Sequence, residues 1–145
     1  MEIRPARDSD LAEITSIFNH EVEHSAPIWV ETPVTLADRR TWLAARQADG
    51  FPVLVAKADG QVLGFASYGG CRPYEGFRQT VEHMTYVSPT ARGRDVGRAL
   101  LAALVSAAWS QGRKVIVGFG TGRNRPLQDP KQATYFLSLI SSSDI

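Results

Sequence analysis

Residues 86–109 read YVSPTARGRDVGRALLAALVSAAW, and this stretch decides the fold. It leads from a strand-like end through a basic turn into a helix, whose apolar residues recur at 96, 100, 101, 104, 105 and 108. The start of a helix has free backbone N–H groups and a partial positive charge. Together with Arg92, Arg94 and Arg98, these groups predict a turn that binds an anion.

The same turn also has a plainer interpretation. Asp95 stands where an N-cap residue is expected, and the arginines would then be solvated surface residues. Gly93 and Gly97 favour the anion site, because a glycine lets the backbone approach a ligand closely.

Composition limits the class of protein. A chain of 145 residues with 43% hydrophobic content predicts one domain over residues 1–145. A net charge of +1 argues against generic binding to nucleic acid or membranes. The single cysteine, Cys71, excludes an intramolecular disulfide and fits a reducing compartment. Because the N-terminus has no apolar signal region and the longest apolar run, in residues 99–109, is too short to span a bilayer, we expect a cytoplasmic protein.

Two helices are predicted in the first third of the chain. The first covers residues 9–24 with Ser9 or Asp10 as its cap, and the second lies within 33–50 with Thr35 as cap and Gly50 as its end. The expected apolar faces are Leu11, Ile14, Ile17, Phe18 and Val22 in the first helix, and Leu36, Trp42, Leu43 and Ala45 in the second.

Strands are predicted in the sequence both before and after the helix that begins at Val96. Residues 2–6 form a short strand, and residues 51–70 form two strands around an Asp-Gly turn at 59–60, a strong hairpin signal. A third strand of this meander covers 78–87, where Ser88-Pro89 ends it, and residues 114–120 read as a buried strand. The predicted order is β-α-α-β-β-β-α-β, an α/β (α+β) fold.

The tail, residues 118–145, differs from the rest of the chain. Pro126 and Pro130 would each break a helix, and only residues 135–140 form an apolar cluster. We therefore expect the chain beyond about residue 121 to be less ordered than the body, or to dock on a second copy through that cluster.

A strand, an Arg-x-x-[Gly]-x-Gly turn and a long helix together resemble the acetyl-CoA pyrophosphate loop of the GNAT N-acetyltransferases. The blocks beginning IFNHEVEHSAPIW, GFASYGGCRPYEGF and RGRDVGRALL further resemble the subgroup that acetylates phosphinothricin and methionine sulfoximine or sulfone. The resemblance covers residues 2 to about 117. It implies a mixed, mostly antiparallel sheet flanked by helices, a homodimer, acetyl-CoA as cosubstrate, no metal, and a small amino-acid-like amine as acceptor.

The resemblance also implies roles for particular residues. Glu82 is the implied general base, working through water, although an exposed strand glutamate would read the same way. The amides of Tyr86 and Val87 are implied to bind the thioester carbonyl and pantetheine arm, where the strand splays from its neighbour. The implied cofactor-binding residues are Thr85, Tyr86, Val87, Arg92, Gly93, Arg94, Asp95, Val96, Gly97, Arg98 and Asn124, and the implied substrate-binding residues are Trp29, Glu31, Arg72, Phe77 and Arg78.

Two departures from the family pattern leave an alternative open. Asp95 replaces a glycine and puts a carboxylate near the expected pyrophosphate. After Gly118 only Asn124 still matches, and the closing β-hairpin of the family is missing. The alternative is an inactive or CoA-binding relic of the family.

A second alternative comes from another class of protein. Residues 20–24, HEVEH, match the His-Glu-x-x-His pattern of zinc hydrolases, with His20 and His24 one helical turn apart and Glu21 between them. No downstream signature supplies a third ligand, so we expect no metal.

Overall fold

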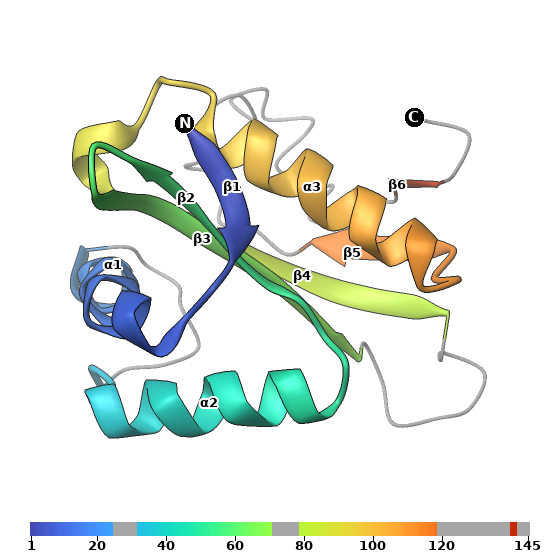
Figure 1. Cartoon of the computed structure of the whole chain (residues 1–145), viewed down its shortest axis with the longest axis horizontal. Helices are drawn as coiled ribbons and strands as arrows, with labels where there is room; N and C mark the ends of the chain where they lie inside the picture. The colour runs from blue at the N-terminus through green and yellow to red at the C-terminus, as the bar shows by residue number, and fades with distance from the viewer. Residues whose placement is uncertain (25–31, 71–78, 119–139, 142–145) are drawn as a thin grey trace.

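A computed structural model describes residues 1–24, 32–70, 79–118 and 140–141 of the chain. Its centre is a six-stranded sheet in the order β1-β2-β3-β4-β5-β6. Helices α1 (Leu11–His24) and α2 (Leu36–Ala48) cover one face of the sheet, and α3 (Val96–Ser110) covers the other (Figure 1). The α+β fold expected from the sequence, a mixed and mostly antiparallel sheet flanked by helices, is confirmed.

Each strand pairs with the strand that comes before or after it in the chain. All pairs are antiparallel except β4 and β5, which run parallel because α3 carries the chain back between them. The strands are β1 (Glu2–Pro5), β2 (Val53–Ala58), β3 (Gln61–Gly70), β4 (Thr80–Val87), β5 (Val115–Gly118) and β6 (Ile140–Ser141).

The predicted turns and ends are confirmed. Asp59 and Gly60 both have positive φ, 52° and 76°, as a two-residue turn between β2 and β3 requires. A short 3-10 turn, η3 (Pro89–Ala91), follows β4 as the proline predicts. Thr35 caps α2 and forms a capping box with Asp38.

Apolar residues on both faces of the sheet make two cores. Beneath α3 lie Tyr68, Val81, Leu100, Leu104 and Ile116, all of them almost fully buried. Beneath α1 and α2 lie Leu11, Ile14, Phe18, Val55 and Phe65. The helices therefore shield both faces of the central strands from water, and β3 is buried along nearly its whole length.

A buried ion cluster joins β1 to the start of α1. The carboxylate of Asp10 is 0% exposed and accepts hydrogen bonds from both terminal nitrogens of Arg4 (2.8 and 3.0 Å), from the backbone N–H of Arg7 (2.8 Å) and from Lys57 (3.3 Å). Burial acts most strongly and opposes ionisation, but these hydrogen bonds together outweigh it and lower the pKa of Asp10 to about 2.

Three expectations about the elements need correction. Asp10 lies in a 3-10 turn, η1 (Asp8–Asp10), and joins this cluster where a simple helix cap was predicted. In α2 only Leu43 of the predicted face is buried, while Leu36 is 41% exposed. The described tail residues 140 and 141 form β6 against β5, so a short piece of chain does extend the sheet there.

In the parts of the chain that the structure describes, no helix is both long enough and apolar enough to cross a membrane.

Candidate active site

The start of α3 has the geometry of an anion site. Gly93 has φ +78° and Asp95 has φ +60°, so the turn enters the helix through two left-handed residues, and the first amides of the helix have no partner within it. Arg92, Arg94 and Arg98 are all exposed around it. The backbone N–H groups of the first turn, together with these cations, could hold a pyrophosphate.

Asp95 occupies the N-cap position of α3, but not as a side-chain cap. Its carboxylate makes no capping hydrogen bond, and its backbone oxygen accepts from the N–H of Ala99 at 3.0 Å. Its left-handed backbone costs about 1 kcal/mol for a residue with a side chain. That conformation explains why glycine suits this place, and it leaves the carboxylate unbound beside the anion site.

An ion pair links Arg92, in the turn before α3, to α1 on the other face of the sheet. Its guanidinium forms an ion pair with Glu21 of α1, whose side chain is only 13% exposed. The turn before α3 is therefore anchored to the helix that covers the other face of the sheet.

The end of β4 lies beside β3. Among the described residues β4 pairs with β5 over residues 80–83 and with β3 as far as Val87. Because the N–H of Ser88 donates to Leu63 at 2.8 Å, the alternation of an antiparallel ladder turns the N–H of Tyr86 toward β3 and that of Val87 away from it. Of the two amides expected to bind the cosubstrate, only that of Val87 points away from β3, toward the side of β4 on which β5 lies.

One face of β4 looks toward α1 and α2 and carries Glu82, Met84 and Tyr86. Glu82 is exposed, and Met84 and Tyr86 pack against the core beneath the two helices. The Tyr86 ring lies edge-on to Phe18 (5.5 Å between centroids) and stacked with Phe65 (5.3 Å). Burial and then the charge of Glu21 raise the pKa of Tyr86, so its phenol stays protonated at neutral pH.

The other face of β4 carries His83 and Thr85. The Nδ1 atom of His83 lies 3.3 Å from the Thr85 hydroxyl, and burial lowers the pKa of the imidazole. His83 is therefore neutral at physiological pH and lies on the α3 side of the sheet, opposite to Glu82.

Two arginines of α2 lie near this surface, and the sequence analysis missed them. The Arg39 guanidinium lies 4.7 Å from the Phe18 ring and 4.8 Å from the Trp42 ring, and that of Arg46 lies 5.7 Å from Trp42. Burial lowers the pKa of each arginine. The signal was present: Arg39 and Arg46 stand three residues before and four after Trp42, on its side of the helix.

Several predicted site residues lie outside the described residues. They are Trp29, Glu31, Arg72, Phe77, Arg78 and Asn124, together with Cys71 and most of the tail. Their roles stay predictions.

The HEVEH segment has no metal-site geometry in the described part of the chain. His20 and His24 stack at 4.2 Å between centroids, and Nδ1 of His24 lies 2.9 Å from the backbone oxygen of His20. Glu21 pairs with Arg92, and no group of three potential metal ligands occurs among the described residues. The zinc-hydrolase interpretation has no support here.

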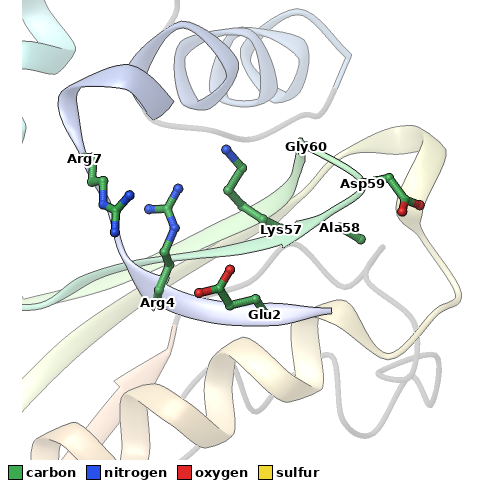
Figure 2. Close-up of a pocket in the computed structure, with 7 residues that line it drawn as sticks. All are labelled: Glu2, Arg4, Arg7, Lys57, Ala58, Asp59 and Gly60. Carbon is green, nitrogen blue, oxygen red and sulfur yellow. The ribbon is translucent and has the colours of Figure 1, made fainter.

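A separate hollow of about 340 Å³ opens between β1 and the β2–β3 turn (Figure 2). Arg4, Arg7 and Lys57 point into it, with Glu2 and Asp59 at its rim. Arg4 and Lys57 are both paired with Asp10, which gives these two cations of the hollow a structural role.

The Val87 amide that points away from β3 and the basic turn at the start of α3 together indicate a class of protein. The chain belongs to the acetyltransferase (GNAT) family, whose model matches residues 11–128. It is an acetyl-CoA-dependent N-acetyltransferase, and the enzymes of this family act on small-molecule acceptors.

Particular relatives narrow the class. The chain is 51% identical over 116 residues, 79% of this chain and 67% of the relative, to the L-methionine sulfoximine/L-methionine sulfone acetyltransferase of Pseudomonas paraeruginosa. It is 38% identical over 104 residues, 72% of this chain and 53% of the relative, to phosphinothricin N-acetyltransferase of Alcaligenes faecalis. The structure of yncA, a putative acetyltransferase from Salmonella typhimurium with acetyl-CoA, matches with a TM-score of 0.82 and 44% identity, covering 86% of this chain and 72% of that one.

Proposed function

We propose that the protein transfers the acetyl group of acetyl-CoA to the α-amine of a small amino acid of the methionine sulfoximine, methionine sulfone or phosphinothricin type. The observation that carries this proposal is the end of β4, where the Val87 amide points away from β3 and the exposed Glu82 lies on the face that looks toward α1 and α2. The names of the relatives support the acceptor class.

The reaction needs a neutral amine and a polarised carbonyl. Glu82, through a water molecule, accepts one proton from the α-ammonium group, and the freed nitrogen attacks the thioester carbon. The N–H of Val87 donates to the carbonyl oxygen while negative charge develops on it. The C–S bond then breaks, the thiolate of CoA leaves with the electron pair, and the second proton of the nitrogen is lost to it or to water.

The cosubstrate site is part of this proposal. The first amides of α3 (Val96, Gly97 and Arg98) hold the pyrophosphate, with Arg94 beside it. Arg92 joins them from its ion pair with Glu21, and Gly93 supplies the positive φ of the turn. Thr85 and Tyr86 line the path of the pantetheine arm. A Cβ on Gly97 would lie 3.5 Å from Cγ2 of Val87, so the first turn of α3 lies close to the end of β4.

Replacing Glu82 with Gln tests the proposal. Gln keeps the shape but cannot accept the proton, so kcat/KM for L-methionine sulfone should fall by roughly a hundredfold while the Kd for CoA stays constant. The loss should shrink at high pH, where free amine is abundant. Glu2→Gln, which changes another exposed strand glutamate, is the matched control. Wild-type turnover of Glu82→Gln at neutral pH would refute the role of Glu82.

We further propose a single domain over residues 1–145 that works as a homodimer in the cytoplasm. The match of the family model to residues 11–128 supports the single domain. Light scattering of the purified protein tests the dimer, because a monomer at assay concentration would contradict it.

A further inference from the structure

The guanidinium group of Arg46 lies directly on the β-sheet. A Cβ atom built on Gly69 of β3 would collide with Nη1 of Arg46 and lie 2.9 Å from its Cζ. Only a glycine leaves room for this contact. The helix α2 thus places a positive charge over one particular residue of β3.

Glu82 is the direct cross-strand neighbour of Gly69. The register pairs Gly69 with Glu82, and side chains of such a pair share one face of the sheet with their Cβ positions about 5 Å apart. The charge of Glu82 acts on Arg46, although no ion pair joins the two. A carboxylate and a guanidinium therefore stand side by side on the face that looks toward α1 and α2.

The guanidinium of Arg46 has a buried nitrogen, Nη1, without a hydrogen-bond partner among the described residues. Its other neighbours are the rings of Trp42 and Phe51, at 5.7 and 6.0 Å from Cζ. A buried donor on a cation is costly unless something pairs with it, so this side chain is suited to an anionic ligand.

We propose that Arg46 binds the α-carboxylate of the acceptor amino acid and thereby holds its α-amine beside Glu82. This inference rests on the proposed function. A zwitterionic amino acid carries its negative and positive groups on the same carbon, and the neighbouring Arg46 and Glu82 present the complementary charges in the same arrangement. A guanidinium with a free N–H suits a carboxylate because it can donate two parallel hydrogen bonds.

The test compares two acceptors, L-methionine sulfone and its α-carboxamide, which keeps the amine and loses the negative charge. The ratio of the two kcat/KM values is measured within one enzyme preparation, so partial unfolding of a variant cancels out. In Arg46→Gln the ratio of acid to amide should fall by about 10- to 100-fold relative to wild type. Arg46→Lys should lower this ratio less than Arg46→Gln does, since an ammonium group keeps the charge but cannot donate two parallel hydrogen bonds.

A backbone variant tests the same contact without changing Arg46. Gly69→Ala should push the guanidinium aside and lower the ratio, because the colliding atoms are the far end of a flexible side chain. Gly70→Ala is the matched control, since no described atom lies within 4 Å of its Cβ. Arg40→Gln is a second control, because that arginine of α2 is exposed and paired with Asp8. Both controls should keep the wild-type ratio.

The outcomes separate the two proposals. Equal losses on both acceptors in Arg46→Gln, or an unchanged ratio in Gly69→Ala, would mean that Arg46 serves only the fold and would overturn the inference while leaving the proposed function intact. If the wild-type enzyme acetylates neither compound, the proposed acceptor class fails and the inference fails with it.

Discussion

Replacing Asp10 with Asn should destabilise the protein by about 3–5 kcal/mol at pH 7, a large part of the stability of a domain of this size. Asn keeps the size of the side chain but removes the charge that Arg4 and Lys57 share, and it turns one acceptor oxygen into a donor facing other donors. Urea unfolding followed by circular dichroism measures the change in free energy.

The pH dependence gives a second, independent magnitude. A shift of the Asp10 pKa from 3.8 to about 2 corresponds to about 2.5 kcal/mol of stability. Because the folded-state pKa is the lower one, this contribution is complete above about pH 4 and is lost as the pH falls toward 2. Asp10→Asn should show none of this acid loss.

The neighbouring Asp8 supplies the control. It also pairs with an arginine, Arg40, at 3.0 Å, but both side chains are more than half exposed, so Asp8→Asn should change the stability by less than about 0.5 kcal/mol. Equal losses for the two variants, or a stability of Asp10→Asn within about 1 kcal/mol of wild type, would refute the argument from burial.

Three further predictions concern the cosubstrate loop and the sheet. Asp95→Asn removes a carboxylate beside the expected pyrophosphate, so CoA should bind about two- to fivefold more tightly, as measured by calorimetry. An unchanged affinity would mean that the Asp95 carboxylate does not lie near the pyrophosphate. The double change Arg92→Ala and Arg98→Ala should weaken CoA binding, most at low salt, whereas Arg40→Ala should not. Gly64→Ala puts a Cβ 2.7 Å from a backbone oxygen of β4 and should lower the free energy of unfolding by about 1–3 kcal/mol. An unchanged midpoint of urea unfolding would contradict this, because it would mean that β3 and β4 can move apart at that position without cost.

The sequence predicted the elements well where a period or a turn residue governs them. The stripe from Val96 to Ala108 places α3, and Asp59-Gly60 places the β2–β3 turn. The α2 face was partly wrong because Leu36 and Ala45 lie on the solvent side, which periodicity over an arginine-rich helix does not reveal.

The ion cluster and the site were less predictable because both depend on contacts between distant residues. Asp10 reads as a helix cap until Lys57, 47 residues later, is seen beside it. The alternation of one ladder decides between the amides of Tyr86 and Val87, and that requires knowing the register. Nothing local to Arg46 indicates that it lies on Gly69.

The mixed direction of the sheet has a consequence for the order of folding. Strands β2 and β3 are joined by a two-residue turn, so their hairpin closes over a short loop and can form on the microsecond scale. The parallel pair β4–β5 forms only after the whole of α3 has crossed over, which carries a higher loop-closure entropy. The turn at residues 92–98 belongs to that crossover, so it should take its final shape in the last step, with low φ-values in a kinetic analysis.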